Sequence, residues 1–341
     1  MGKIVTFGEI MLRLAPEGYY RFVQAASYGA TYGGGEANVA VSLAQFGLDA
    51  AFVTKLPNHE IGQSAVNRLR AFGVDTSGIV RGGERVGIYF LEKGASQRPS
   101  KVIYDRAGSA IACSVPADFD WDVLFNGASW FHFTGITPAL GDNVAEICYS
   151  ACKVAQKKGI TVSCDLNYRK NLWSRKAAGE MMAKLMPFVD LCIANEEDAA
   201  DVFGIRASGT NVTAGEIDRD GYREVAGALT NRFGFKLGTA ITLRESISAN
   251  DNNWAALFYN GKDYFFSRKY PVHIVDRVGG GDSFGAGLIY GFSQGLPPQE
   301  TLEFAVAASC LKHSIEGDFN CVSVDEVKKL SGGDASGRVQ R

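Results

Sequence analysis

The sequence lacks the features that would mark several specialised classes of protein. Its 35 lysines and arginines nearly balance its 37 aspartates and glutamates, which leaves a net charge of −2. That balance argues against nucleic acid or an anionic membrane as the main partner. No apolar run approaches the length of a membrane span, and residues 1–14 do not have the pattern of a secretory signal. With 46% apolar residues among 341, the chain is predicted to be globular, with one large core or two modest ones.

The cysteines do not form a recognisable disulfide framework. They are odd in number and scattered, at positions 113, 148, 152, 164, 192, 310 and 321. Such a set indicates a reducing compartment, so we expect a cytoplasmic protein. Cys148 and Cys152 are four residues apart in a stretch with helical spacing, but no histidine or further cysteine clusters with them. We expect both to lie on a helix face, and a zinc site is the weaker alternative.

Proline is scarce, with 9 residues, whereas glycine is abundant, with 40, which suits many tight turns between strands and helices. Short apolar runs typical of strands, such as "AAFVTKL" at 50–56, alternate with segments of helical spacing, such as "EANVAVSLAQFG" at 36–47. Four helical segments end in glycine, at positions 47, 73, 159 and 234. The alternation predicts an α/β fold with a mostly parallel central sheet flanked by helices on both faces.

Two regions break this alternation. Residues of about 11–32 and 84–107 show strand-like patterns that no helix follows. We expect them to form a small antiparallel sheet that projects from the core as a lid. Residues 206–221 are predicted to be a surface excursion, and residues 333–341 a disordered tail. The rest, residues 1–332, is predicted to be a single domain.

The segment "DRVGGGDSF" at 276–284 places three glycines directly before an acid. Phe284, Leu288 and Phe292 then recur every four residues, so a helix is predicted to start here. The first turn of a helix has unpaired N–H groups and a partial positive charge, and glycines let these groups approach a phosphate closely. Two common phosphate loops do not fit. Asp282 stands where GxxxxGK[ST] requires lysine, and it would face a pyrophosphate in GxGxxG.

Asp282 has two interpretations on this stretch alone. It could be a general base, which takes a proton from an attacking hydroxyl while main-chain amides stabilise the transferred group. It could also be a helix N-cap, with the glycines forming only a turn. The stretch by itself favours neither.

The same segment resembles the C-terminal signature D-T-x-G-A-G-D-x-F of the ribokinase-like (PfkB) carbohydrate kinases. The matching positions are Asp276, Gly279, Gly281, Asp282 and Phe284, while Arg277 replaces the usual Thr and Gly280 the usual Ala. "GGGEANVAVSLAQFG" at 33–47 resembles the family's glycine pair before a helix that touches the sugar. "NEED" at 195–198 resembles its N-x-x-E element near the metal, with Asp198 in place of Glu. The resemblance covers about residues 2–330, and it implies a ribokinase-like fold with a small β-sheet lid.

The predicted lid carries information about the substrate. Tyr104 and Arg106 share one face in strand alternation, and an arginine can hold the carboxylate of an acid sugar in a fork. The segments "YDR" at 104–106, "DLNYRKNLW" at 165–173 and "SIEGDFN" at 314–320 resemble the 2-keto-3-deoxygluconate kinase branch of the family. The resemblance implies ATP-dependent phosphorylation of the terminal hydroxyl of that sugar acid, with Asp282 as base and an anion hole at Gly279, Gly280 and Gly281.

The resemblance also implies which residues bind the ligands. Those expected to hold the sugar acid are Gly34, Gly35, Asn38, Tyr89, Tyr104, Arg106, Arg169 and Asp282. Those expected near ATP are Asn167, Arg169, Asn195, Thr242, Arg244, Ser246, Gly279, Gly281 and Ala308. Mg²⁺ would bridge the phosphates with an indirect contribution from Asp198, and a monovalent cation is a further option.

Other interpretations stay open. Tyr89 could be an aromatic of the lid interface, Arg106 a surface ion pair, and Asn195 only the cap of a helix at residue 196. Glu9 and Arg13 are assigned no role, and the four histidines are predicted to be structural. The protein could instead be a fructokinase-like enzyme, a kinase of a related keto-acid sugar such as the galactonate epimer, or a catalytically silent sugar sensor. We also expect a homo-oligomer that associates through the lid.

Overall fold

The computed structural model describes residues 2–207, 219–334 and 337. Most of the predicted surface excursion and most of the predicted tail lie outside the described residues. Within the described part of the chain, no helix is long and apolar enough to cross a membrane.

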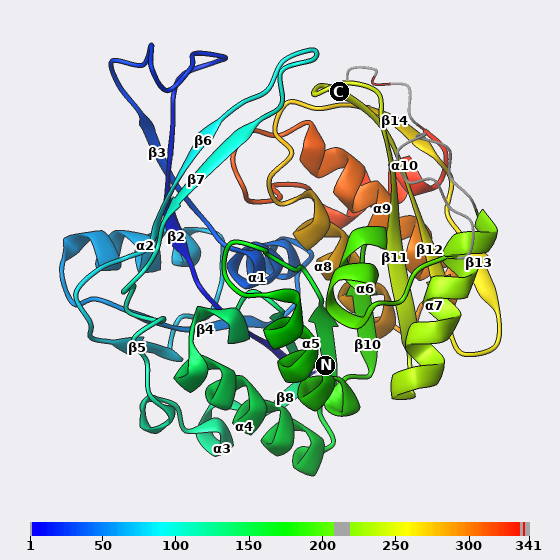
Figure 1. Ribbon diagram of the computed structural model, residues 1–341, viewed down its shortest axis with the longest axis horizontal. Helices are drawn as coiled ribbons and strands as arrows, with labels where there is room; N and C mark the ends of the chain where they lie inside the picture. The colour runs from blue at the N-terminus through cyan, green and yellow to red at the C-terminus, as the bar shows by residue number, and fades with distance from the viewer. Residues whose placement is uncertain (1, 208–218, 335–336, 338–341) are drawn as a thin grey trace.

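A large, mostly parallel sheet forms the centre of the molecule, which confirms the predicted fold class (Figure 1). Its strands, in spatial order, are β13 (Tyr264–Phe266), β12 (Asp251–Tyr259), β11 (Gly238–Ser246), β10 (Leu191–Ala194), β9 (Thr161–Asp165), β8 (Ala128–Thr134), β1 (Lys3–Phe7), β4 (Ala50–Leu56) and β5 (Ile79–Arg81), with β14 (Tyr270–His273) also paired to β12. The strands from β11 to β5 pair in parallel, and only β12, β13 and β14 pair antiparallel.

Helices cover both faces of this sheet and bury apolar side chains against it. One face is covered by α3 (Trp121–Leu124), α4 (Asp142–Lys158), α5 (Arg175–Leu185), α6 (Glu196–Phe203) and α7 (Arg219–Phe233), and the other by α1 (Gly35–Gln45), α2 (Glu60–Ala71), α8 (Gly280–Ser293), α9 (Pro298–His313) and α10 (Val324–Ser331). The predicted helix ends are confirmed. Gly47, Gly73, Gly159 and Gly234 follow α1, α2, α4 and α7 and all have positive φ, a backbone conformation that glycine adopts without strain.

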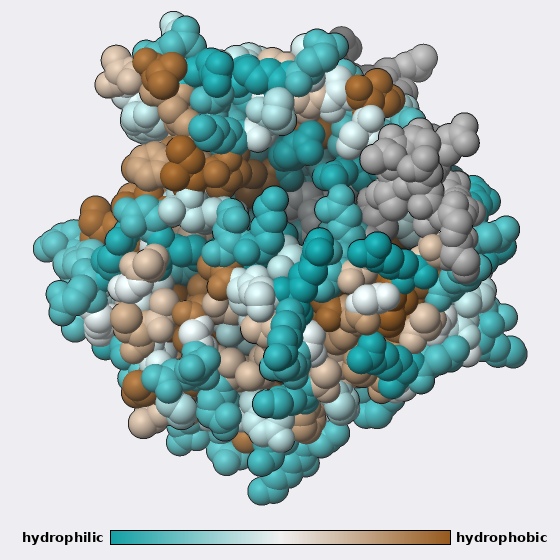
Figure 2. Space-filling view, viewed as in Figure 1, coloured by the Kyte–Doolittle hydropathy of each residue, from teal (hydrophilic) through white to brown (hydrophobic). Residues whose placement is uncertain are grey.

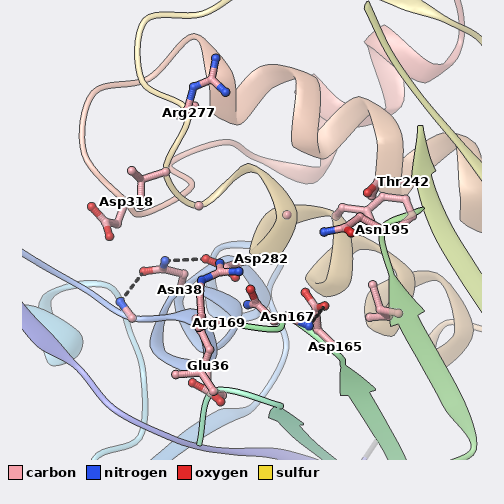
Figure 3. A pocket seen from close by; sticks show the side chains of 18 of the residues that line it. Glu36, Asn38, Asp165, Asn167, Arg169, Asn195, Thr242, Arg277, Asp282 and Asp318 are labelled. Carbon is pink, nitrogen blue, oxygen red and sulfur yellow. Dashed lines mark hydrogen bonds between the residues drawn. The ribbon is translucent and has the colours of Figure 1, made fainter. Parts of the chain in front are cut away.

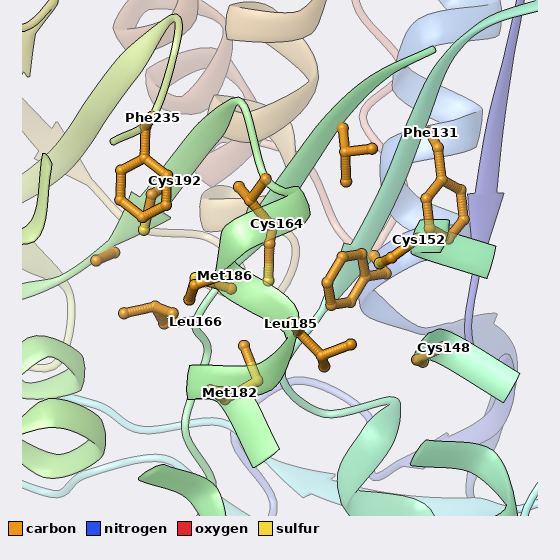
Figure 4. Packing of buried hydrophobic residues seen from close by; sticks show 14 of the residues in the cluster. Phe131, Cys148, Cys152, Cys164, Leu166, Met182, Leu185, Met186, Cys192 and Phe235 are labelled. Atoms are coloured by element: carbon orange, nitrogen blue, oxygen red, sulfur yellow. The ribbon is translucent and has the colours of Figure 1, made fainter. Parts of the chain in front are cut away.

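The cysteines contribute to the core. Cys148 and Cys152 lie on the buried side of α4, among apolar side chains of β8, β9 and α5 (Figure 4). Among the described residues, no group of three or more His, Cys, Asp or Glu side chains is arranged to hold a metal ion. All seven cysteines are free thiols. The helix-face interpretation of this pair is therefore confirmed.

A separate four-stranded sheet stands above one side of the large sheet (Figure 1). Its strands, in order, are β3 (Gly29–Gly33), β2 (Met11–Ala15), β6 (Ile88–Glu92) and β7 (Lys101–Asp105). The prediction that it is wholly antiparallel was wrong, because β2 and β6 pair in parallel. A parallel pair needs a long crossover, and α1, β4, α2 and β5 supply it by lying between the two strands in the chain.

Candidate active site

A cavity of about 380 Å³ lies between the carboxyl ends of the parallel strands and the small sheet (Figure 3), within the range usual for small-molecule sites. Strand β1 has β8 on one side and β4 on the other, so later strands add to the sheet in opposite directions on its two sides. Ligands of open α/β sheets bind at such a point. The starts of α1 and α8 also line the cavity, through Gly35 and Gly281.

A side chain would have a different consequence at each of the three glycines of the 276–284 segment. Gly279 is the N-cap of α8 with φ of 86°, and a Cβ there would collide with the carbonyl oxygen of Asp318. A Cβ on Gly280 would lie 2.5 Å from Cε1 of His313, so this glycine makes room for the imidazole. A Cβ on Gly281 would meet no described atom within 4 Å. Protein packing does not explain Gly281, whose missing side chain keeps the cavity open.

Asp282 lies in the first turn of α8 and is not its N-cap, because Gly279 occupies that position. Its Oδ2 accepts a 2.7 Å hydrogen bond from the Asn38 amide, and Oδ1 of Asn38 accepts one from the main-chain N–H of Gly34 (Figure 3). Removal from bulk water raises the pKa of Asp282 to about 6, and the Asn38 hydrogen bond opposes that rise. The carboxylate faces the cavity and is ready to accept a proton near neutral pH.

The small sheet brings three of the predicted sugar-binding residues to the cavity: Tyr89, Tyr104 and Arg106. Arg106 is not a surface ion pair. Its side chain is buried and forms an ion pair with Glu9, which follows β1, and its guanidinium lies 5.4 Å from the Tyr104 ring centroid. The hydroxyl of Tyr89 donates a 2.5 Å hydrogen bond to Asp318. These contacts join the small sheet to the body of the protein.

The loops after β9 and β10 form another wall of the cavity, with Asn167, Arg169 and Asn195 (Figure 3). Asp198, in the first turn of α6, also lines this wall. Asn195 caps α6, since its Oδ1 accepts from the main-chain N–H groups of residues 197 and 198. Asp198 accepts from the Tyr168 N–H. Burial, and then the charges of Asp198 and Asp282, raises the pKa of Asp165 well above its usual value. This wall therefore gathers acidic groups that would favour a bound cation.

Thr242 and Arg244 of β11 extend the cavity on the side away from the small sheet. Three predicted site residues do not line it among the described residues: Gly280, Ser246 and Ala308. Ser246 is the last residue of β11, and Ala308 is fully buried within α9. Gly280 lies beneath the imidazole of His313.

Sequence reasoning assigned no site role to several residues that line the cavity, namely Glu9, Glu36, Asp165, His313 and Asp318. Glu9 was left without a role and His313 was predicted to be structural, but both line the cavity. Glu36 is fully buried in the first turn of α1 and accepts hydrogen bonds from Thr134 N and Thr137 Oγ1, and burial raises its pKa to about 7. Carboxylates at or just after the carboxyl end of a strand, such as Asp165 and Glu9, were the available signal. Asp318 lies in the loop at 314–320, a segment that resembles the family, but the resemblance assigned this residue no role.

The geometry defines a class of protein. A half-buried carboxylate stands beside the start of a helix that presents unpaired N–H groups to an open cavity. Such a pair can remove a proton from an alcohol and stabilise a transferred anionic group. The small sheet above the cavity can exclude water from that step. The fold and site together define an α/β group-transfer enzyme with a small-molecule substrate.

The chain belongs to the pfkB family of carbohydrate kinases. The model of that family matches residues 1–224 and 252–324. The protein is therefore a sugar kinase, and ATP is the co-substrate of the family's reaction.

Individual relatives support this assignment. The chain is 32% identical over 334 residues to 2-dehydro-3-deoxygalactonokinase of Haloferax volcanii, with 98% of both chains covered. It is 53% identical to 2-dehydro-3-deoxygluconokinase of Thermotoga maritima, whose crystal structure matches with a TM-score of 0.94 over 98% of this chain and 100% of that one. An Escherichia coli ribokinase II structure with ATP and Mg²⁺ shares the fold, at 20% identity and a TM-score of 0.78, over 97% of this chain and 99% of that one.

Proposed function

We propose that this protein transfers the γ-phosphoryl group of ATP to the terminal 6-hydroxyl of 2-keto-3-deoxygluconate, giving 2-keto-3-deoxy-6-phosphogluconate. The observation that carries the proposal is the position of Asp282. Its carboxylate faces the cavity, has the Asn38 amide as its hydrogen-bond partner, and lies one residue from the open space at Gly281. Asp282 takes the proton of the sugar hydroxyl. The first-turn N–H groups of α8 donate hydrogen bonds that stabilise the negative charge on the phosphoryl oxygens.

The sugar acid lies between the start of α1 and the small sheet. Gly34 and Gly35 let the chain approach the sugar closely, Asn38 lines the same part of the cavity, and Tyr89 and Tyr104 offer hydroxyl groups. Arg106 and Arg169 are cations that line the same cavity, and either suits a carboxylate. Arg169 also points toward Asp282 and Asn38, so it can serve the transferred phosphate instead (Figure 3).

The residues present fit a magnesium–nucleotide complex. Within the described ranges, no three His, Cys, Asp or Glu side chains form a metal cluster. Magnesium in phosphoryl transfer is held by one or two carboxylates together with phosphates and water. Asp165 and Asp198 suit that role, because their mutual repulsion would fall when a cation binds. The ion would neutralise phosphate charge, and Asn167, Asn195, Thr242 and Arg244 would line the nucleotide side.

The small sheet also offers a surface for a second copy of the chain. Strand β7 is exposed along its whole length, including the apolar residues Val102 and Ile103, and hydrophobic side chains gather on this part of the surface (Figure 2). A second copy pairing there would cover them. Light scattering on the wild type and on Ile103→Asp tests this, since the variant should have the lower mass; an unchanged mass would remove the dimer proposal.

A coupled ADP-release assay tests the proposed function. The panel contains 2-keto-3-deoxygluconate, its galactonate epimer, fructose and a neutral hexose, each with and without Mg²⁺ and with and without K⁺. We expect Mg²⁺-dependent turnover with the highest kcat/KM on 2-keto-3-deoxygluconate. A higher kcat/KM on the galactonate epimer would identify that epimer as the substrate instead. A higher kcat/KM on fructose would make the enzyme fructokinase-like, and no turnover on any compound would support a sensor.

A glycine variant links the assay to the geometry. Gly281→Ala places a methyl group in the open cavity and should lower kcat while leaving the melting temperature unchanged. Gly29→Ala is the matched control, because a Cβ there makes only an ordinary contact, 3.7 Å from the Ala15 carbonyl oxygen. Equal turnover in both variants would contradict an anion site at Gly281.

A further inference from the structure

Arg13, in the middle of β2, is the most deeply placed cation of the small sheet, with 3% of its side chain exposed. Its guanidinium forms a fork between two carboxylates: Nη1 donates to Asp318 at 2.7 Å, and Nη2 donates to Asp276 at 2.5 Å. Both carboxylates belong to the other end of the chain. Arg13 therefore joins the small sheet to two loops of the main body.

Both loops hold the segment at residues 276–284, called here the glycine segment, in place. Asp276 begins that segment, and its side chain also accepts hydrogen bonds from the N–H groups of Val278 and Gly317. Asp318 contacts the same segment through its main chain, since its carbonyl oxygen packs against Gly279. A change in the position of either aspartate would therefore move the start of α8, where Gly281 and Asp282 lie.

The fork also reaches the sugar side of the cavity. The second oxygen of Asp318 accepts the hydroxyl of Tyr89, a cavity residue on β6. The ammonium of Lys312, which is fully buried, donates to the carbonyl oxygen of Ile315, and its Cε would lie 3.1 Å from a Cβ on Gly279. Two buried cations, Arg13 and Lys312, thus balance two buried carboxylates beneath the glycine segment. Buried charges of this kind are costly to leave unpaired.

We propose that Arg13 is a positioning residue for phosphoryl transfer: by holding Asp276 and Asp318 together, it ties the small sheet and Tyr89 to the glycine segment that carries Gly281 and Asp282. Arg13 itself does not line the cavity among the described residues, so it acts through the aspartates. A movement of the small sheet on sugar binding would then also move the N–H groups at Gly281 and the carboxylate of Asp282. The inference rests on the proposed function, because it assigns Arg13 a part in that reaction.

The test is Arg13→Lys. The shorter ammonium keeps the charge, but it is a single point and cannot hold both carboxylates in a planar fork. Displacing a reacting group by about 1 Å can cost roughly 100-fold in rate, so we expect kcat to fall about 10- to 100-fold with little change in the KM for ATP. Arg85→Lys is the matched control, because Arg85 makes an exposed ion pair with Asp105 at the edge of the same sheet.

The outcomes separate the two proposals. Circular dichroism and thermal melting first establish that both variants are folded at the assay temperature. If folded Arg13→Lys keeps the kcat of the wild type, or loses no more than Arg85→Lys, the positioning role is wrong and the fork is only structural. If the wild type turns over no sugar, the proposed function itself fails. Should Arg13→Lys not fold, Asp318→Asn keeps the Tyr89 contact, weakens the fork, and is expected to lower kcat in the same way.

Discussion

The cavity has two walls that are built differently. One wall comes from the main body: Asp282, Asn38 and Gly281 lie at the starts of two core helices. The other comes from the small sheet, where Tyr104 is 43% exposed and Arg106 depends on Glu9 of the main body for its position. The tip of the small sheet meets the main body through exposed hydrogen bonds, including Ser96 N–H to Asn250 Oδ1 at 2.7 Å.

This contrast separates chemistry from recognition. Groups that must be placed within a fraction of an ångström are on rigid elements with buried partners, whereas the groups expected to select the sugar are on a sheet with exposed contacts at its tip. Substitutions in the wall from the main body should therefore lower turnover, and substitutions of the small-sheet residues that line the cavity should change substrate binding. Arg13 is in the small sheet but does not line the cavity among the described residues, so its expected effect on turnover is a separate case. The following predictions test that division, from the largest expected effect to the smallest.

Asp282→Asn should cause the largest loss. Removing a general base typically lowers turnover by about 10²- to 10⁴-fold, and the nearly equal size of the amide should leave nucleotide binding intact. Turnover is measured by ADP release, and ATP affinity by calorimetry on the same sample. Turnover close to that of the wild type would remove Asp282 from the base role.

Arg106→Ala should affect the small-sheet wall selectively. A hydrogen bond to a charged group is worth about 1.5–3 kcal/mol, so the KM for an acid sugar should rise roughly 10- to 100-fold. The KM for a neutral sugar should rise much less and serves as the internal control for the loss of the Glu9 ion pair. An equal rise for both sugars would argue against recognition of a carboxylate.

The pH dependence of kcat/KM should report the pKa of Asp282, which lies in the wall from the main body. Asp282 must be ionised to accept a proton, and burial raises its pKa to about 6. Activity is therefore present above that pKa and is lost as the pH falls through it, by about tenfold for each further unit. The measurement is kcat/KM between pH 5 and pH 8 with Mg²⁺ in excess. A profile that stays flat down to pH 5 would be inconsistent with this carboxyl as the base.

Asn250→Ala should have the smallest effect, because it removes one exposed hydrogen bond at the tip of the small sheet. The Ala249 N–H to Ser96 carbonyl bond remains, so we expect at most a two- to tenfold rise in the KM for the sugar, at roughly unchanged kcat. Asn260→Ala, in a turn between β12 and β13, is the control. A fall in kcat as large as that of Asp282→Asn would contradict the separation of the two walls.

Much of the fold could be predicted from the sequence because it follows from local periodicity. The apolar runs became β4, β8, β9 and β10, the glycine-terminated segments became α1, α2, α4 and α7, and the 276–284 segment introduced a helix. The gathering of Gly34, Asn38, Arg106, Arg169 and Asp282 around one cavity followed from resemblance to a family. The roles of these residues in binding and catalysis stay predictions.

The direction of the β2–β6 pairing, the partner of Arg106 and the Arg13 fork could not be predicted in the same way. Arg13 and Asp276 are 263 positions apart, and no pattern of neighbouring residues specifies such a contact. The sequence by itself determined the helices, the strands and the presence of an acid after three glycines. Only the tertiary structure decided which charges became neighbours and how far water was excluded from Asp282, because the pKa of a carboxyl group depends on the burial and charges around it in space.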